Sequence, residues 1–247
     1  MESSLKLHEA IEKLGTDEAI ATAKSVAEDE KISWDIAISC VFKAVVNDPN
    51  RVPKIGGKND DPKAVIKKWI KKYNNGKNGR ASVRQSNPPG TVADPIIEEM
   101  IGARLVKLSR NDLSKIKHAH RLSMSAENIL GLILEEYLSD NLTSHGWHCA
   151  WGETVKSVDF VHEDGKLLQI KNRSNSENSS SSSVRNGTSI IKWYRIKADR
   201  VEYMWDSLNK ICDTTDLSEE SFSKFVKSTL TKNPDCLALE SDNCWSK

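Results

Sequence analysis

The sequence has no run of apolar residues long enough to cross a bilayer, and its acidic, amphipathic start after Met1 lacks signal-peptide character. Its five cysteines are odd in number and scattered, which argues against a disulfide framework and fits a reducing compartment. The close His/Cys group at residues 145–149 has no second half, so it is a poor zinc site. We therefore expect no association with a membrane and a location in the cytoplasm.

The composition is that of a globular protein. With 247 residues, the chain can bury a proper core as one large domain or as two modest ones. Its apolar fraction of 38% and charged fraction of 29% are typical of soluble proteins, and the sequence shows no internal repeat. The chain is therefore too long to be a simple binding module.

Positive charge is concentrated in one segment, although the net charge of the chain is only +1. Residues 51–84 contain eleven Lys and Arg against two Asp, so this basic segment carries a local charge of +9. Trp69 and Tyr73 lie four residues apart among the lysines, which places both rings on one helical face. A solvated helix explains the charge alone, whereas a packed helix beside a polyanion explains both features. On the second interpretation the segment clamps double-stranded DNA through Lys67, Lys68, Lys71 and Lys72.

Apolar residues at helical spacing predict a mainly helical first half. The expected helices cover residues 2–13, 16–27, 34–46, 64–73, 96–106 and 113–119, with connectors rich in Pro, Gly and Asn at 47–63 and 74–95. From Ser123 the pattern changes to a long helix up to about Leu142, short strands, a hairpin, a Ser/Asn loop and C-terminal helices. This order predicts an α/β fold with a central mixed β-sheet flanked by helices. We expect a helical N-terminal region at residues 1–115 and an α/β core at residues 116–247.

A predicted β-hairpin at residues 157–172 carries Asp159 on its first strand and Gln169 and Lys171 on its second. Gln169 and Lys171 share a face because they are two residues apart. Many metal-dependent nucleases build their catalytic centre from an acid, a hairpin, and a polar residue followed two positions later by Lys. A phosphodiester is an anion that resists attack, so such a centre needs a divalent cation and a positive group near the attacking water. Asp159 and Gln169 are therefore candidate ligands of Mg²⁺, and Lys171 is the candidate positive group.

The turn of the hairpin decides whether Asp159 shares that face. A two-residue turn would set Asp159 opposite Ile170, on the wrong face. A three-residue loop at residues 163–165, with Gly165 in the left-handed conformation and a bulge, sets Asp159 across from Gln169. Both turns suit the sequence, and we predict the three-residue loop because the site requires it.

The long helix after the first half offers further acids. At about 100° per residue, Glu127 falls in the apolar stripe and is expected to project from the face that packs on the sheet. A buried acid needs a partner, which can be a metal ion or the positive end of the helix dipole. We expect Glu127 to ligate the ion directly or through water. Glu135 and Glu136 lie on other sides of the helix and are expected to be surface or flanking acids.

A polar loop follows the second strand of the hairpin, and residues 171–188 are rich in hydroxyl, amide and guanidinium groups. A flexible linker explains this composition, but a linker is seldom placed between a core strand and an apolar-aromatic segment such as residues 190–194. Asn and Arg read adenine and guanine edges bidentately, and Ser and Thr contact phosphates or bases. The candidates for contacts to DNA are Asn172, Arg173, Asn175, Glu177, Asn178, Arg185 and Asn186.

Residues from about 120 to 197 also carry a family resemblance. Their motifs include Glu-Asn-Ile-Leu-Gly at 127–131, Leu-Gln-Ile-Lys-Asn-Arg at 168–173 and Glu-Asn-Ser-Ser-Ser-Ser at 177–182. This combination resembles the SinI-type family of type II restriction endonucleases. The resemblance implies a restriction-endonuclease-like fold, Mg²⁺-dependent cleavage of both DNA strands that leaves 5′-phosphates, and a homodimer that matches a palindromic site of the GGWCC kind. It also implies a cognate DNA methyltransferase in the same restriction-modification system.

One position departs from the pattern of the wider nuclease group, in which an acid stands two residues before the Lys. Here that position is Gln169, whose amide oxygen can ligate Mg²⁺ but brings no negative charge. Asp159, with Glu127, would supply the negative charge, which leaves the number of bound ions open. Two rival functions also stay open: a repair or junction nuclease that reads DNA structure, and a DNA-binding regulator without a metal site.

Overall fold

The computed structural model describes residues 5–56, 60–174 and 188–245. It divides into two compact units: unit 1 combines residues 1–79 with 135–222, and unit 2 combines residues 80–134 with 223–247. Two helices, α6 (Arg110–Leu142) and α8 (Glu219–Lys232), each contribute residues to both units.

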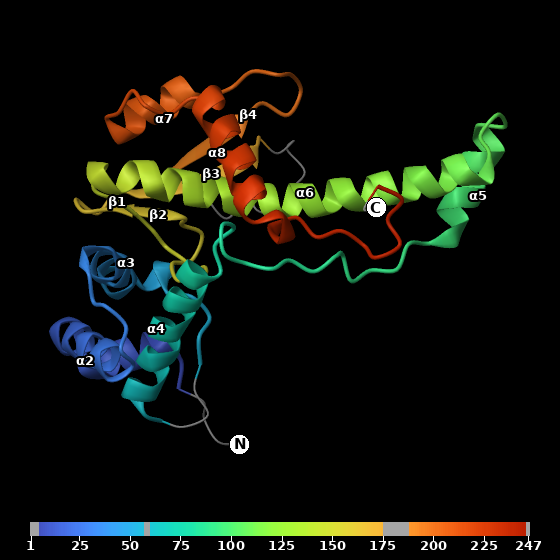
Figure 1. Cartoon of the computed structure of the whole chain (residues 1–247). Coiled ribbons are helices and arrows are strands. Elements are labelled where there is room, and N and C mark those ends of the chain that lie inside the picture. Colours follow the sequence, from blue (N-terminus) through green and yellow to red (C-terminus); the bar gives the residue numbers. More distant parts are fainter. Residues whose placement is uncertain (1–4, 57–59, 175–187, 246–247) are drawn as a thin grey trace. The chain divides into compact units, whose positions relative to one another are not determined.

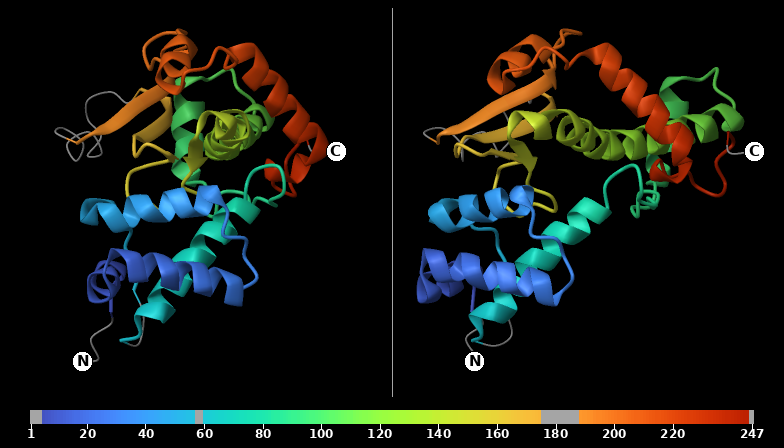
Figure 2. Two further views of the ribbon diagram at one scale, coloured as in Figure 1. Left: turned by 90° about the vertical axis from the view of Figure 1, so that its left-hand side faces the viewer. Right: turned by 60° about the vertical axis from the view of Figure 1, so that its left-hand side comes forward.

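Unit 1 begins with four helices that pack on one another (Figures 1 and 2). They are α1 (Leu7–Leu14), α2 (Thr16–Asp29), α3 (Ile36–Asn47) and α4 (Pro62–Asn78). The carboxylates of Asp35 and Asp61 accept hydrogen bonds from N–H groups in the first turns of α3 and α4, which fixes where these helices begin. Trp69 and Tyr73 of α4 are buried and stack on each other, so the aromatic pair among the lysines belongs to the core.

The second half of unit 1 contains a four-stranded mixed sheet in the order β1-β2-β3-β4. The strands are β1 (Trp147–Cys149), β2 (Phe160–His162), β3 (Leu167–Arg173) and β4 (Ile190–Ile196). The first two pairs are antiparallel, and β3 pairs with β4 in parallel. All residues of β1 and the first four of β3 are buried, as expected for a sheet that is covered on both faces.

Helices cover the two faces of this sheet (Figures 1 and 2). On one side α3 packs on β1 and β2. On the other, an aromatic cluster joins the sheet to α6, α7 (Trp205–Cys212) and the start of α8. In this cluster the ring of Trp205 lies 5.2 Å from that of Trp193 and 5.8 Å from the rings of both Tyr137 and Phe222. The predicted α/β fold with a central mixed sheet flanked by helices is confirmed, and it is consistent with a restriction-endonuclease-like core.

Unit 2 contains α5 (Pro95–Arg104), the first part of α6, the last part of α8 and the C-terminal segment with the short helix η4 (Pro234–Cys236). Arg121 of α6 ties the unit together, because its guanidinium donates to the Pro89 and Thr91 carbonyls at 2.8 and 2.7 Å and to the Glu240 carboxylate. In contrast, α5 buries none of its side chains. Three of its apolar side chains are more than half exposed: Ile96, Ile97 and Met100.

Two details of the fold differ from the sequence-based expectation. The segments 113–119 and 123–142 form one continuous helix, α6, because no Pro or Gly interrupts residues 110–130. Asp159 precedes β2 and does not lie within it. The expected boundary between an N-terminal region and an α/β core, after residue 115, falls inside α6. The separate roles of these two regions stay a prediction. Within the described ranges, no helix is both long and apolar enough to span a membrane.

Candidate active site

The hairpin closes through a three-residue loop, as predicted. The strands β2 and β3 pair in the register that a loop at residues 163–165 requires. Gly165 has a φ of +92°, a value that glycine adopts without strain. Extending the register by one residue sets Asp159 across from Gln169.

Asp159 is held at three points. Its N–H donates to the Leu168 carbonyl at 3.0 Å, and its carbonyl accepts from the Ala150 N–H at 2.8 Å. Its carboxylate accepts a hydrogen bond of 2.7 Å from the Ile170 N–H of β3. The side chain thus takes the place of a backbone acceptor beside β3, and its carboxylate is presented with little conformational freedom.

The loop between β1 and Asp159 packs closely on α4 through Gly152. A Cβ atom added to Gly76 of α4 would lie 2.3 Å from the backbone nitrogen of Gly152, and one added to Gly152 would lie 2.5 Å from the Lys72 carbonyl oxygen. Gly152 also has a φ of +73°. Only glycine at both positions permits this approach, so the helix of the basic segment forms a wall of the site.

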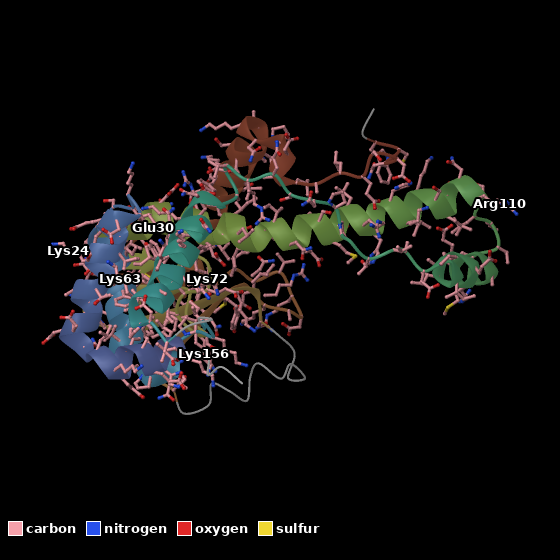
Figure 3. The ribbon with its side chains drawn as sticks, turned by 90° about the horizontal axis from the view of Figure 1, so that it is seen from below. Lys24, Glu30, Lys63, Lys72, Arg110 and Lys156 are labelled. Carbon is pink, nitrogen blue, oxygen red and sulfur yellow. The ribbon has the colours of Figure 1, made fainter. Side chains whose placement is uncertain are left out.

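Asp159 and Gln169 line one cavity in unit 1, with a volume of about 470 Å³. Glu153 lines it too, together with three lysines: Lys54, Lys72 and Lys156. Figure 3 shows Lys72 on α4 and Lys156 on the loop before β2. A cavity that combines acidic oxygens with ammonium groups suits a phosphate accompanied by a divalent cation.

The side-chain oxygen of Gln169 is a buried hydrogen-bond acceptor. Gln169 is 8% exposed, and its Oε1 atom is buried without a hydrogen-bond partner among the described residues. A buried acceptor left unpaired costs about 1–3 kcal/mol. An amide oxygen is a suitable ligand for a hard cation, and Mg²⁺ prefers oxygen ligands. This atom therefore fits the role of a metal ligand.

Glu135 of α6 lies in the same unit as Asp159, and its pKa responds to the charge of Asp159. Burial, together with the nearby negative charges of Asp159 and Glu153, raises the pKa of Glu135 to about 7. Burial raises the pKa of the Cys149 thiol, and the negative charges of Glu135 and Asp159 raise it further. A divalent cation near these carboxylates would favour their ionised forms. Asp159 and Gln169 line one cavity with oxygen groups that suit Mg²⁺, and Glu135 is a further candidate ligand in the same unit.

The expectation that Glu127 projects from the packed face of its helix is wrong, since its side chain is exposed. The buried stripe there includes Ile129, and a residue two positions away lies about 200° around the helix. Glu127 belongs to unit 2, whereas Asp159 and Glu135 belong to unit 1, so its role as a ligand stays a prediction. Glu135 and Glu136 were expected to be surface or flanking acids, but Glu135 is only partly exposed and Glu136 is buried. Buried apolar residues flank both acids at 133–134 and 137–138, and these were the available signal.

Glu135→Gln is expected to change how stability depends on pH when divalent cations are absent. A carboxyl with a pKa of about 7 in the folded chain and an ordinary value of 4.5 keeps its proton longer in the folded state. The protonated carboxyl therefore adds about 3 kcal/mol to the free energy of unfolding below pH 4.5, and this stabilisation is lost as the pH rises through 7. Urea unfolding in EDTA at low and high pH should therefore show the wild-type chain losing stability relative to the variant. A difference that stays constant with pH would contradict this assignment.

The remaining candidates on β3 differ in their surroundings. Lys171 is partly exposed and shares a strand face with Gln169. The side-chain oxygen of Asn172 accepts a 2.9 Å hydrogen bond from Nε of Arg195 on β4, and Arg173 is exposed. The other loop candidates lie outside the described residues: Asn175, Glu177, Asn178, Arg185 and Asn186.

The four candidate lysines of the basic segment all lie on α4. Lys67 and Lys71 form ion pairs with Glu30, the residue that follows α2, and these pairs lower the pKa of that carboxyl. Lys68 donates to a backbone carbonyl at 2.6 Å. Lys72 is the member of this set that lines the cavity with Asp159.

Comparisons with known proteins show the family of this chain. The chain matches the family model described as SinI restriction endonuclease over residues 17–232. It is 43% identical to the type II restriction enzyme Eco47I of Escherichia coli and 40% identical to the type II restriction enzyme SinI of Salmonella infantis, each over 154 residues. Each match covers 60% of this chain and 66% of the relative, just under two-thirds of its length. The family resemblance predicted from the sequence is confirmed, and the chain belongs to the SinI restriction endonuclease family.

Proposed function

We propose that this protein is a type II restriction endonuclease that hydrolyses phosphodiesters of double-stranded DNA at a specific sequence, with Mg²⁺ as cofactor. One observation carries the proposal beyond family membership: Asp159 lines one cavity beside three lysines and Gln169, whose buried side-chain oxygen has no hydrogen-bond partner among the described residues. Carboxylate and amide oxygens suit the cation, and ammonium groups suit the phosphate.

The residues of unit 1 divide the chemistry among them. Asp159 and Gln169, with Glu135 as a further candidate, would hold the cation, which would supply Lewis-acid polarisation of the phosphoryl oxygens. Lys171 orients the attacking water and stabilises the negative charge that develops in the transition state. The cavity lysines, Lys54, Lys72 and Lys156, bind the phosphates of the DNA backbone.

The finer points of the proposal come from the family resemblance. They are a palindromic site of the GGWCC kind, products with 5′-phosphates, a homodimer and a cognate DNA methyltransferase in the same system. A two-fold dimer presents the same surface to each half of a palindrome, which is why the dimer and the palindrome belong together. Asn172, Arg173 and the loop that follows are proposed to contact the DNA.

Incubation of supercoiled plasmid with the full chain, in Mg²⁺ or in EDTA, tests the proposed function. We expect discrete linear fragments in Mg²⁺ and intact plasmid in EDTA. Binding of DNA without Mg²⁺-dependent cleavage would instead identify a DNA-binding regulator and reject the enzyme.

Gln169→Glu is expected to retain Mg²⁺ binding and cleavage. The substitution keeps an oxygen at the same position and adds a negative charge, which strengthens the attraction for the cation. Gln169→Leu removes the oxygen and should raise the Mg²⁺ concentration needed for cleavage. Cleavage rates measured across a Mg²⁺ titration compare the two variants, and equal Mg²⁺ dependence in the wild type and the leucine variant would contradict a ligand role.

Neutralising Lys67, Lys68, Lys71 and Lys72 together is expected to flatten the dependence of DNA affinity on salt. Each lost phosphate contact should lower the slope of log affinity against log salt by roughly 0.9. Binding titrations in EDTA at several salt concentrations measure this slope. Lys24→Ala is the control, since Lys24 is an exposed lysine on α2, outside the basic segment (Figure 3). An unchanged slope in the fourfold variant would assign these lysines to a solvated surface.

A further inference from the structure

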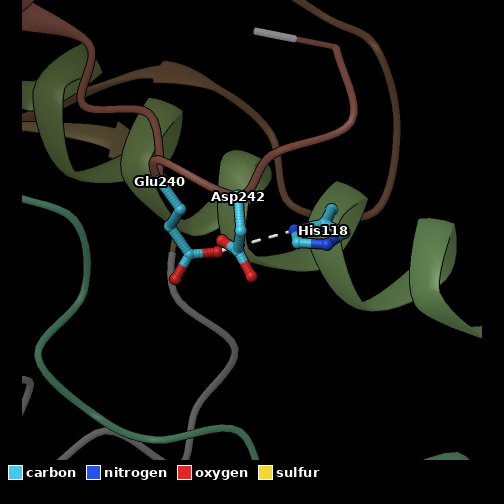
Figure 4. Close-up of side chains that lie close together, drawn as sticks. All are labelled: His118, Glu240 and Asp242. Atoms are coloured by element: carbon cyan, nitrogen blue, oxygen red, sulfur yellow. Dashed lines mark ion pairs between the residues drawn. The ribbon is translucent and has the colours of Figure 1, made fainter.

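A second cluster of metal-ligating side chains lies in unit 2, among residues that the proposed nuclease site does not use (Figure 4). His118 lies on α6, and Glu240 and Asp242 lie in the C-terminal segment. Each offers one ligand atom, and these atoms lie within 4.8 Å of one another. Residues that are far apart in sequence thus place an imidazole and two carboxylates at one point.

His118 has a buried ring nitrogen that needs a hydrogen-bond partner or a metal ion. It is only 5% exposed, and its Nδ1 atom has no hydrogen-bond partner in the part of the chain that the structure describes. The Glu240 Oε2 atom lies 3.8 Å from Nδ1, which is too far for a hydrogen bond. An unpaired buried nitrogen is unfavourable, and ligation of a cation would remove that penalty.

Glu240 is already oriented by its neighbours. Arg121 occupies its Oε1 atom, while Oε2 faces His118. The Glu240 carbonyl accepts from the Asn243 N–H at 3.0 Å, a turn that brings Asp242 beside it. The guanidinium offsets one of the two carboxylate charges, so one negative charge remains to attract a cation.

The donor set selects the class of metal. Imidazole with carboxylates suits first-row transition metals and Zn²⁺, whereas Mg²⁺ and Ca²⁺ prefer oxygen alone. In tetrahedral Zn²⁺ sites the ligand atoms lie about 2.0–2.2 Å from the ion and hence roughly 3.4 Å apart. Side-chain rotations that move the ligand atoms by about 1 Å would bring the three atoms to this separation. A water molecule can take the fourth position.

We propose that His118, Glu240 and Asp242 form a Zn²⁺ site that fastens the C-terminal segment to α6. The site is structural, because it joins an irregular segment to a helix and binding of the ion stabilises the folded state.

Zn²⁺ titration of the metal-free full chain, in competition with a chromogenic chelator, tests the proposal. An Asp159→Ala background removes the carboxylate of the nuclease site, so that Zn²⁺ uptake reports on unit 2. We expect one Zn²⁺ per chain, affinity at least tenfold weaker after His118→Ala or Asp242→Asn, and an upward shift in Tm of a few degrees with Zn²⁺ that both variants lose. Asp242 is exposed, so its variant should fold normally.

His120→Ala is the matched control, because His120 is an exposed histidine on the same helix. It should bind Zn²⁺ as the parent chain does. Absence of Zn²⁺ uptake by the parent chain would overturn the proposal, as would uptake that His118→Ala and Asp242→Asn both leave unchanged.

Discussion

Asp159→Ala is expected to abolish Mg²⁺-dependent cleavage of DNA, with a loss of at least about 10³-fold in rate. The substitution removes the carboxylate that lines the cavity with Gln169 and that accepts the Ile170 N–H. The change therefore removes a proposed metal ligand and also a hydrogen bond that anchors the segment before β2 to β3.

Asp159→Asn separates these two effects. Asparagine keeps an oxygen that can accept the Ile170 N–H but carries no charge, so this variant should keep its Tm and still lose cleavage. Asp164→Asn is the control, because Asp164 is an exposed acid in the loop of the same hairpin, paired with Lys166. Single-turnover cleavage and thermal unfolding of the three variants measure the expected difference. Full activity of Asp159→Ala would reject the assignment of the site.

Lys171→Ala should likewise abolish cleavage while leaving DNA binding nearly intact. The ammonium group is proposed to act on the attacking water and on the charge of the transition state, a contribution of about 10²–10⁴-fold in rate. DNA binding depends on many lysines, so the loss of one changes affinity little.

Lys166→Ala is the matched control for this prediction. Lys166 is an exposed lysine of the same hairpin, and it pairs with Asp164 at 2.7 Å. Its variant should cleave as the wild type does. A Lys171→Ala variant that loses DNA affinity and cleavage in equal proportion would show that Lys171 binds the substrate and does not act in the chemical step.

Local features of the sequence predicted a hairpin but left its turn open, and the three-residue loop was chosen because the proposed site requires it. Gly165 allows the three-residue loop, and the alternation of side chains along β3 then fixes which residues face Asp159. The helices were also predictable, because their apolar spacing and their capping aspartates are local signals.

The rest of the site depends on contacts between distant segments. The angle of Glu127 on its helix gave no information about which acid of α6 belongs to the same unit as Asp159, and that acid is Glu135, whose pKa the charge of Asp159 raises. Likewise, no local pattern indicates that Gly76 and Gly152 meet backbone to backbone. That contact makes α4 a wall of the cavity, and it explains why Lys72 joins the acids of the hairpin.

Mapping the ends of plasmid fragments is the measurement that tests the central claim most directly. A sequenced plasmid would be digested in Mg²⁺ with the wild-type chain and with Asp159→Ala, and the fragment ends would be sequenced. We predict that the wild-type chain produces ends at one short palindromic sequence, all with 5′-phosphates, and that the variant produces none. Ends scattered over many sequences, or the same ends from Asp159→Ala, would contradict a sequence-specific nuclease centred on Asp159.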